Sequence, residues 1–463
     1  MAHGTFQVPF PVNEPVLSYA PGSPEREELQ DMYNKMYNQD PIDVPMYIGG
    51  EMVRTSDKRP MTPPHEHGKV LGYFNYGDSS HVVAAIDSAL AARKRWAAFS
   101  FEERATIFLK AADLIAGKYR AKLNASTMLA QGKNCFQAEI DASCELIDFL
   151  RFNTYFAQEI QAVQPESSEG IWNRTEYRAL EGFTFAVTPF NFTAIAANLP
   201  ACMALMGNVV VWKPADTQMY SAQVLMEIFR EAGVPDGVIN LITVDGPVAG
   251  DVVFKHPDFS GLHFTGSTAV FRHLWKTIGE NLELYKTYPR IVGETGGKDF
   301  VVAHSSANTK AVAAGLLRGS FEYQGQKCSA ASRAYISDDI WPAVEDQLLT
   351  DLNTLKMGSP ADFGNFINAV IDRRSFDKIK SYIEYAKSQD DCEIISGGGC
   401  DDSVGYFVEP TVILTSNPKF RTMVEEIFGP VLTIYVFPAS EFAETLELVD
   451  STSEYALTGG VFA

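Results

Sequence analysis

The sequence predicts an α/β protein with two parallel-sheet domains, and three observations support this fold class. Apolar runs of strand length alternate with helical segments from Phe183 to the helix that starts at Thr268. A second alternating set starts near Gly296. Such alternation is typical of parallel sheets covered by helices. The chain has 463 residues, of which 46% are hydrophobic, which is enough for two or three domains with large cores.

The overall charge and hydropathy exclude two classes of protein. The formal net charge of -20 argues against nucleic-acid binding, which needs clustered Lys and Arg. No apolar run reaches the roughly 18 to 20 residues that span a bilayer. Residues 1–24 contain no Lys or Arg, which fits neither a secretory signal nor an Arg-rich transit peptide. We therefore expect a cytoplasmic location, with the mitochondrial matrix as the alternative if a presequence has been removed.

The first third of the chain precedes the alternating region. Residues 1 to about 45 are rich in Pro, Tyr and Asn and are expected to form a surface arm. Residues 47–54 and 70–76 read as short strands, and residues 79 to about 161 as packed helices. Ser100 and Glu103 form a capping box ahead of one of these helices. The polar stretch from Pro165 to Glu181 breaks the helical period and predicts a hairpin that leaves the body of the domain.

The alternating elements follow in order. In the first set, strands are predicted at 183–187, 209–212, 239–244, 262–265 and 290–292, and helices at 194–206, 221–232 and from 268. The second set is predicted to contain strands at 299–302, 334–337 and 431–436, and helices at 309–321 and 375–388.

Cys328 is the one cysteine of six with unusual neighbours. It lies in Gln324-Gly325-Gln326-Lys327-Cys328-Ser329, directly after a predicted helix. Small, polar and basic neighbours can leave a thiol partly exposed and stabilise its thiolate. No Cys-x-x-Cys pair occurs, so neither a zinc site nor a disulfide framework is expected. His65-Glu66-His67 reads as a solvated turn, and no metal site is predicted.

Glu294 ends the predicted strand at residues 290–292 and is followed by glycines. A carboxylate in such a position can face a cleft and act as a general base if desolvation raises its pKa. The alternative is a solvated turn residue. The interval from Glu294 to Cys328 is long enough for a strand, a helix and a return to the same cleft.

Two further turns join a strand to a helix. Asn191 could donate its side-chain amide to an oxyanion, or it could cap the helix that follows, and both roles can hold at once. Phe264-Thr265-Gly266-Ser267 offers a close backbone approach and a helix N-terminus to a pyrophosphate. This turn lacks the G-x-G-x-x-G fingerprint, because Phe271 stands where a third small residue is sought.

Together, six motifs resemble the aldehyde dehydrogenase family in order and spacing, from about residue 45 to the end. They are Thr188-Pro189-Phe190-Asn191, Trp212-Lys213-Pro214, Phe264-Thr265-Gly266-Ser267, Gly293-Glu294-Thr295-Gly296-Gly297-Lys298, Gly325-Gln326-Lys327-Cys328 and Glu425-Glu426-Ile427-Phe428-Gly429-Pro430-Val431. The resemblance implies two Rossmann-like parallel-sheet domains with an oligomerisation hairpin. After the arm expected at 1–45, it implies a dinucleotide-binding domain at 46–295 with the hairpin at about 163–182, and a catalytic domain at 296–463.

The resemblance also implies an enzyme that oxidises an aldehyde through a cysteine thioester, with NAD as cofactor. Cys328 would be the nucleophile, Asn191 the oxyanion donor with the Cys328 amide, and Glu294 the base that activates water. The residues implied to bind the cofactor are Thr188, Lys213, Gly266, Ser267, Glu426 and Phe428. A homodimer or a higher homo-oligomer is expected, and no nucleic-acid or membrane partner.

Six further segments carry a finer resemblance: Ala138-Glu139-Ile140-Asp141, Glu145-Leu146-Ile147-Asp148-Phe149, Glu181-Gly182-Phe183, Phe190-Asn191-Phe192-Thr193-Ala194-Ile195, Phe321-Glu322-Tyr323 and Asp401-Asp402-Ser403-Val404-Gly405-Tyr406-Phe407. By these segments the chain is most similar to the branch of the family that oxidises 1-pyrroline-5-carboxylate, as glutamate semialdehyde, to glutamate in proline catabolism. The resemblance implies that Ser329 binds the substrate carboxylate, that Phe192 lines the pocket and that Glu145 lies near the amino end. For Glu145, a plain helix-surface carboxylate is an equal alternative. The alternatives for the whole chain are another semialdehyde dehydrogenase, such as one for succinate semialdehyde, and a catalytically silent homologue with a binding role.

The sequence departs from the family at its end. It stops at Ala463, within an expected strand of the catalytic domain. Family members continue through a glycine-rich loop that anchors the substrate carboxylate and through a terminal strand that joins the sheet of another subunit. The catalytic domain is therefore expected to be incomplete at its C-terminus.

Overall fold

The computed structural model describes residues 6–455 and 457–463, and it divides into two compact units. Unit 1 contains most residues up to Glu294, and unit 2 contains Thr295–Ala463. Two short segments, Thr62–Lys69 and Gln131–Gln137, also belong to unit 2. The sequence analysis predicted domains that are each continuous in the sequence, so it did not place these two segments in the second domain.

Unit 1 is built on a seven-stranded sheet in the order β10-β9-β6-β7-β8-β2-β3. The strands of this sheet are β2 (Met46–Ile48), β3 (Glu51–Val53), β6 (Phe183–Val187), β7 (Val210–Lys213), β8 (Ile239–Leu241), β9 (Phe259–Thr265) and β10 (Arg290–Glu294). The neighbouring pairs from β10 to β8 are parallel, whereas β2 is antiparallel to both β8 and β3. A separate three-stranded sheet contains β1 (Ile42–Val44), β4 (Lys58–Met61) and β5 (Gly72–Asn75).

Helices cover this seven-stranded sheet, and an outer layer packs on them. α7 (Thr193–Leu205) contacts β6 and β7, whereas α2 (Ser79–Ala97) contacts β6, β7 and β8 and packs with α9 (Gly246–Val253). The crossover from β6 through α7 to β7 and the crossover from β8 through α9 to β9 run in opposite directions across the sheet, so right-handed connections place α7 and α9 on opposite faces. α3 (Phe101–Ala116) and α6 (Glu145–Ala162) pack on α7 as a further layer. The remaining α-helices of unit 1 with more than four residues are α1 (Pro24–Asn38), α4 (Arg120–Gln131), α8 (Met219–Ala232) and α10 (Thr268–Glu280), and residues Glu139–Cys144 form a π-helix.

Unit 2 is a second layered α/β body, with the sheet order β13-β16-β17-β12-β11-β18. Its strands are β11 (Asp299–Ala303), β12 (Ala331–Ser337), β13 (Cys392–Ser396), β16 (Thr411–Thr415), β17 (Val431–Phe437) and β18 (Gly459–Phe462), and β14 (Cys400–Asp401) pairs with β15 (Phe407–Val408). Its helices are α11 (Thr309–Phe321), α12 (Trp341–Leu352), α13 (Arg373–Lys387), α14 (Arg421–Val424) and α15 (Phe442–Thr452), and the four-residue α5 (Cys135–Ala138) ends at the unit boundary. The strand pairs of the six-stranded sheet are parallel except the antiparallel pair β13–β16, and the separate pair β14–β15 is also antiparallel.

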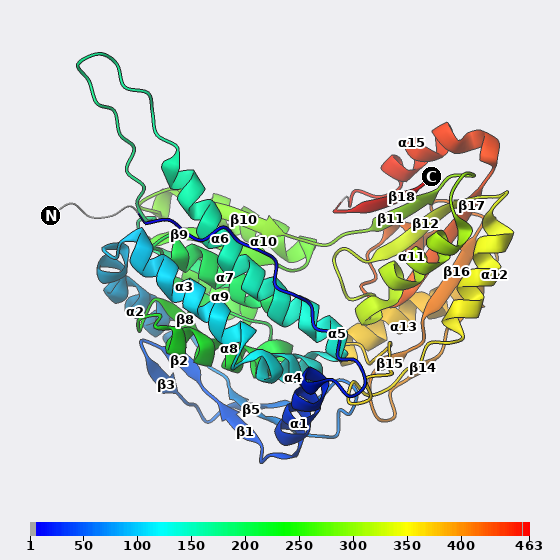
Figure 1. Cartoon of the computed structure of the whole chain (residues 1–463), viewed down its shortest axis with the longest axis horizontal. Helices are drawn as coiled ribbons and strands as arrows, with labels where there is room; N and C mark the ends of the chain where they lie inside the picture. Colours follow the sequence, from blue (N-terminus) through cyan, green and yellow to red (C-terminus); the bar gives the residue numbers. More distant parts are fainter. Residues whose placement is uncertain (1–5, 456) are drawn as a thin grey trace. The chain divides into compact units, whose positions relative to one another are not determined.

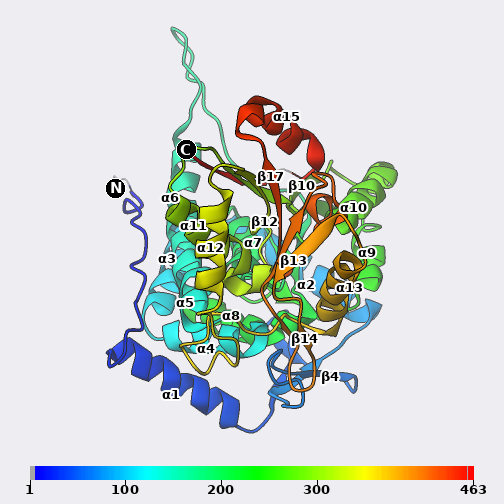
Figure 2. The same ribbon diagram turned by 90° about the vertical axis from the view of Figure 1, so that its right-hand side faces the viewer.

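Alternating residues of the unit 2 strands supply two separate cores. Val301 of β11 packs with residues of α11 and α12, whereas the next residue, Val302, packs with residues of α13 and α15. This alternation is the period of two expected for a strand that is buried on both faces. α11 and α12 therefore cover one face of the sheet and α13 the other (Figure 2).

The structure confirms the α/β class with parallel sheets and corrects the N-terminal region. The capping box of Ser100 and Glu103 is present, and Gly233, with φ of 108°, ends α8 in the left-handed region. Part of the expected arm, however, is the helix α1, with Pro24 at its first position. The short helix α9, which starts after Asp245, was not predicted either.

The hairpin predicted after α6 projects from the body of unit 1 (Figure 1). Residues 163–182, all of which the structure describes, form no strand. Side chains instead form hydrogen bonds between the two sides of the hairpin. Gln164 accepts a hydrogen bond from the backbone N–H of Thr175 at 2.9 Å, and the Tyr177 hydroxyl donates to the Val163 carbonyl at 3.0 Å. The tip is apolar and exposed: Trp172 is 83% and Ile171 59% accessible.

Candidate functional site

The parallel strands of unit 1 bring six predicted site residues to one edge of its sheet. Thr188 and Asn191 follow β6, and Lys213 ends β7. Gly266 and Ser267 follow β9, and Glu294 ends β10. From β6 the chain runs through β7 to β8 on one side and returns to β9 on the other side. The carboxyl ends of β6 and β9 therefore flank a topological switch point, where open α/β sheets bind their ligands.

The turn after β6 is fixed to the end of β7. The Thr188 hydroxyl accepts a hydrogen bond from the Trp212 indole N–H at 2.9 Å, and the Thr188 backbone N–H donates to the Lys213 carbonyl at 3.2 Å. Asn191 is buried in this turn, with 4% of its surface exposed. The helix cap of α7 is Phe192, which is half-buried, and its side chain makes no capping bond. The capping role considered for Asn191 is therefore wrong.

Lys213 is a half-buried cation at the same edge. Burial lowers the pKa of its ammonium group, and the nearby carboxylates of Asp216 and Asp245 oppose that shift. Burial also raises the pKa of Asp216, against the opposing effect of Lys213. Lys213 thus offers a charge with reduced solvation to a polar ligand at this edge.

The turn from β9 into α10 leaves a helix N-terminus accessible to a ligand. The Ser267 hydroxyl accepts from the Val270 backbone N–H at 3.4 Å, and Ser267 is the cap of the 13-residue helix α10. A Cβ at Gly266 would lie 2.8 Å from the ring of Phe264, so a side chain is disfavoured there. The first backbone N–H groups of a helix and its dipole attract anions such as phosphate.

Glu294 lies at the same edge, as the last residue of β10. Its carbonyl accepts from the Gly266 backbone N–H at 3.1 Å, so the two motifs are adjacent. Its side chain is exposed. The sequence analysis considered a desolvated Glu294 carboxylate, but unit 1 leaves this side chain exposed to solvent.

In unit 2 the predicted residues lie at the amino ends of the strands, whereas in unit 1 they lie at the carboxyl ends. Cys328 and Ser329 precede β12, and Glu426 and Phe428 precede β17. Cys328 is half-buried and Ser329 is exposed. Parallel neighbours begin at the same edge of a sheet, so the loops before β11, β12 and β17 lie side by side.

An unusual backbone segment holds the cysteine loop. Tyr323, Gln324 and Gly325 are consecutive residues in the left-handed region, with φ of 51°, 55° and 64°. Such conformations cost energy at non-glycine residues and persist only where the surroundings hold them. Here the Tyr323 hydroxyl donates to the Gln131 carbonyl at 2.8 Å. The Gln324 amide donates to the carbonyls of Gly132 and Ala369, at 3.1 and 2.9 Å.

Two glycines allow the loop before β11 to contact the other two loops. A Cβ at Gly297 would lie 2.2 Å from the Cys328 carbonyl oxygen, and one at Gly296 would lie 2.4 Å from a Glu426 carboxylate oxygen. The Gly297 backbone N–H donates to Glu426 at 3.0 Å. Burial raises the pKa of Glu426, and this hydrogen bond and the charge of Lys378 oppose the shift. Phe428, with φ of 61°, follows in a strained turn.

Sequence reasoning gave no role to a set of buried charges beneath these loops. Lys298 is fully buried, its Nζ atom has no hydrogen-bond partner, and burial lowers its pKa to about 7. Burial raises the pKa of Asp299 to about 6, although the Thr458 backbone N–H donates to it at 2.8 Å. Arg333 is also buried and donates to the Lys298 carbonyl at 2.8 Å. The only sequence signal was the run Gly-Gly-Lys-Asp itself.

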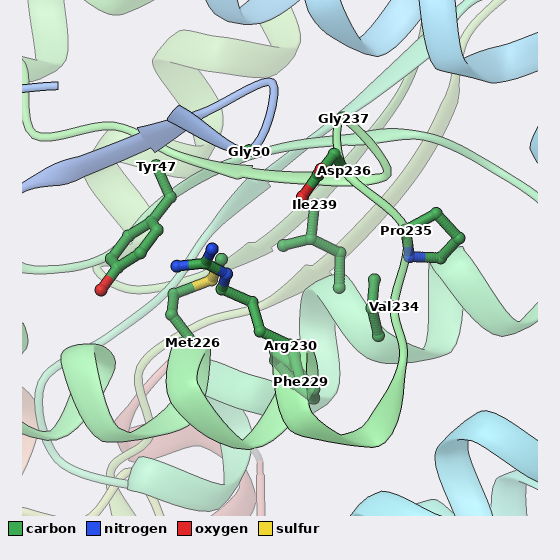
Figure 3. A pocket seen from close by; sticks show the side chains of 10 residues that line it. All are labelled: Tyr47, Gly50, Met226, Phe229, Arg230, Val234, Pro235, Asp236, Gly237 and Ile239. Atoms are coloured by element: carbon green, nitrogen blue, oxygen red, sulfur yellow. The ribbon is translucent and has the colours of Figure 1, made fainter. Parts of the chain in front are cut away.

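Glu145 lies elsewhere in unit 1, at the first position of α6. It is half-buried and lines a groove of about 610 Å³ together with residues of the N-terminal segment. A second cavity of unit 1, of about 20 Å³, has room for roughly one water molecule. There Arg230 at the end of α8 reaches toward Tyr47, 5.5 Å from the ring centroid (Figure 3). None of the predicted site residues lines this second cavity.

The structure corrects the expectation for His65-Glu66-His67. His65 is buried rather than solvated, with 4% of its surface exposed, and burial lowers its pKa to about 4. Over residues 6–455 and 457–463, no group of three or more His, Cys, Asp or Glu side chains could hold a metal ion. All six cysteines are free thiols. In the same part of the chain, no helix is long and apolar enough to cross a membrane.

Comparisons with known proteins agree on one family. The sequence profile described as the aldehyde dehydrogenase family matches residues 53–463. The mitochondrial delta-1-pyrroline-5-carboxylate dehydrogenase of Dictyostelium discoideum is 50% identical over 98% of this chain and 82% of its own length. The human mitochondrial enzyme of that name is 49% identical over 97% of this chain and 80% of its own length.

A solved structure gives the same result at the level of the fold. The structure of delta-pyrroline-5-carboxylate dehydrogenase from Mycobacterium tuberculosis bound with NAD superposes with a TM-score of 0.96 and 48% sequence identity. The match covers 100% of this chain and 85% of that one.

Proposed function

The chain belongs to the aldehyde dehydrogenase family, and we propose on this premise that it is a 1-pyrroline-5-carboxylate dehydrogenase. It oxidises glutamate semialdehyde, the open-chain form of 1-pyrroline-5-carboxylate, to glutamate with NAD. This reaction is the second step of proline catabolism. The observation that carries the proposal is the placement of Cys328, on a rigid loop in backbone contact with Gly297 and beside the loop of Glu426.

The residues at the carboxyl edge of unit 1 fit a dinucleotide. Gly266 and Ser267 present the N-terminus of α10 to the pyrophosphate, and Lys213 offers its ammonium group to the adenosine ribose. Thr188 lies at the same edge and is held by Trp212. In unit 2, we assign the nicotinamide ribose to Glu426, with Phe428 packing nearby. NAD held by these residues would supply the hydride acceptor for the oxidation.

The chemistry begins with the thiolate of Cys328, whose sulfur adds to the aldehyde carbon. The side-chain amide of Asn191 and the backbone N–H of Cys328 donate hydrogen bonds to the oxygen as its negative charge develops. Loss of hydride from the same carbon leaves a thioester. Covalent catalysis of this kind divides a difficult oxidation into two easier steps.

Glu294 serves the second half of the reaction. Its carboxylate accepts a proton from the water that adds to the thioester carbonyl. The carbon–sulfur bond then breaks, which releases glutamate and restores the Cys328 thiolate. We assign the substrate carboxylate to Ser329, the wall of the aldehyde pocket to Phe192, and the amino end of the substrate to Glu145.

A panel of aldehydes tests the proposed substrate. NADH absorbance is followed with 1-pyrroline-5-carboxylate, succinate semialdehyde and an unsubstituted aldehyde such as pentanal. We expect the highest kcat/KM for 1-pyrroline-5-carboxylate. A preference for succinate semialdehyde would assign another substrate within the family, and no turnover of any aldehyde would indicate a silent homologue.

We further propose that the protein is a homodimer or a higher homo-oligomer and that the hairpin at residues 163–182 contributes to assembly. The exposed apolar side chains at its tip support this proposal. The cytoplasm remains our predicted location. The names of the Dictyostelium and human relatives support the alternative, the mitochondrial matrix.

A further inference from the structure

Polar contacts dock the N-terminal segment, residues 8–19, along α6 (Figure 1). The Val8 backbone N–H donates to Gln158 at 2.7 Å near the far end of the helix. The side-chain amide of Asn13 and the backbone N–H of Glu14 each donate to Asp148 at 2.7 Å. This segment, called the arm below, is thus held at two points along α6.

A buried carboxylate forms the main anchor of the arm. Glu139 has no exposed surface, and its two oxygens accept from the Leu17 backbone N–H at 2.9 Å and the Tyr19 hydroxyl at 2.7 Å. Arg120 forms an ion pair with Glu139 and another with Glu14. Burial raises the pKa of Glu139, but the hydrogen bonds from Arg120 and Tyr19 outweigh this effect, and the net shift is downward.

Glu139 also begins an irregular helical turn that leads into α6. Residues Glu139–Cys144 form a π-helix, in which the Glu145 backbone N–H donates to the Ile140 carbonyl, five residues earlier. π-Turns inside α-helices are rare and are frequently found at functional sites. Because the π-turn ends at Glu145, its register decides which way the Glu145 side chain leaves the helix.

The arm and α6 together line the groove that contains Glu145. Asn13, Glu14 and Val16 come from the arm, and Glu145, Asp148 and Phe152 come from α6. Asp148 and Glu14 hold the arm in place, through the contacts above and an ion pair of 2.7 Å from Arg151 to Glu14. Glu145 is the third carboxylate on the groove.

We propose that the arm is a specificity element of the enzyme, and that Glu139 is the positioning residue that fixes the arm and the π-turn so that Glu145 faces the amino group of the substrate. This inference rests on the proposed function, because it takes the substrate contact of Glu145 from there. Glu139 itself touches no substrate. Its effect passes through the backbone of the turn and through the arm.

The test compares two aldehydes of equal length, glutamate semialdehyde and 5-oxopentanoate, which lacks the amino group. In Glu139→Gln, the ratio of kcat/KM for these substrates should fall by about tenfold, mainly through a higher KM for glutamate semialdehyde. The kinetics of 5-oxopentanoate should change by less than about twofold. Tyr19→Phe removes a single hydrogen bond to Glu139 and should lower the ratio in the same direction, which keeps the test valid if Glu139→Gln does not fold.

Glu231→Gln is the matched control. Glu231 accepts from Lys118 and Tyr119 in the same unit but does not line the groove, so its loss should leave the substrate ratio unchanged. An unchanged ratio in both Glu139→Gln and Tyr19→Phe, with a lowered ratio in Glu145→Gln, would overturn the inference and leave the proposed function standing. No preference for glutamate semialdehyde in the wild type would instead overturn the proposed function, and the inference with it.

Discussion

Glu294 is an exposed carboxylate on a well-held strand end. The backbone of β10 is paired with β9, and the Gly266 backbone N–H donates to the Glu294 carbonyl. The backbone is therefore positioned by the sheet, while the side chain is accessible to water. This arrangement suits a base that activates water and does not need to hold substrate.

Glu294→Gln should slow thioester hydrolysis more than hydride transfer, because the amide cannot accept the proton of the attacking water. Loss of a general base costs roughly 10² to 10⁴ in rate. Rapid mixing should then show a burst of NADH followed by slow turnover. Steady turnover close to that of the wild type would assign Glu294 to structure.

Asp299 gives the structure a pH-dependent stability. Its folded pKa is about 6, against 3.8 for an unperturbed carboxyl group. Between these two values the folded chain holds a proton that the unfolded chain has lost, so stability falls as the pH rises through this window. Above about pH 6 the full penalty of the buried carboxylate is present.

Asp299→Asn should therefore raise the melting temperature relative to the wild type more at pH 8 than at pH 5. A shift of this size corresponds to roughly 1 to 3 kcal/mol. Calorimetry of both proteins at the two pH values measures it. The same difference between variant and wild type at both values would contradict a raised pKa at Asp299.

At the scale of elements, the left-handed segment Tyr323–Gly325 fixes the loop that carries Cys328. A Cβ at Gly325 would lie 2.3 Å from the Gly429 carbonyl oxygen, in the loop before β17. Gly325→Ala should therefore destabilise the protein by more than about 1 kcal/mol and lower kcat. Differential scanning fluorimetry and the NADH assay measure the two effects.

Gly279→Ala is the matched control for that substitution. Gly279 lies within α10, and a Cβ there would meet no atom within 4 Å. Alanine is favoured over glycine in a helix by about 0.5 to 1 kcal/mol, so this variant should be slightly more stable than the wild type. Equal stability of the two variants would show that the left-handed segment is not under the constraint described.

The hairpin at residues 163–182 exposes Trp172 at its tip. Large exposed apolar patches serve as interaction sites on soluble proteins, and the proposal above assigns the tip of this hairpin to assembly. Trp172→Asp should shift the molar mass measured by light scattering toward that of the monomer. Ser168→Asp adds the same charge to the same hairpin without removing an apolar side chain and should have a smaller effect; equal masses for all three proteins would contradict a role in assembly.

The sequence predicted regular elements well where local signals agreed. β6 and α11 have the predicted bounds, because apolar periodicity and turn residues mark both ends. α1 was read as an arm, since Pro, Tyr and Asn dominate its surroundings, although Pro is well tolerated at a first helical position. The π-turn at Glu139–Cys144 carries no composition signal, because it depends on tertiary contacts to Glu139.

At the scale of the whole molecule, each unit holds its own set of predicted site residues. Unit 1 presents its residues where strands end, and unit 2 presents Cys328 and Glu426 where strands begin. The motifs revealed these residue types and their order. The sequence could not reveal the buried charges of Lys298 and Arg333 or the anchoring of the arm, because both depend on contacts between residues that are distant in the sequence.

The central claim is that Cys328 carries the aldehyde through a thioester. The most direct measurement compares wild type and Cys328→Ala in NADH formation from 1-pyrroline-5-carboxylate, with NAD binding followed by calorimetry on both. We predict that the variant forms no NADH above background and binds NAD with unchanged affinity, because the dinucleotide is assigned to other residues. Turnover retained by Cys328→Ala would contradict the thioester mechanism.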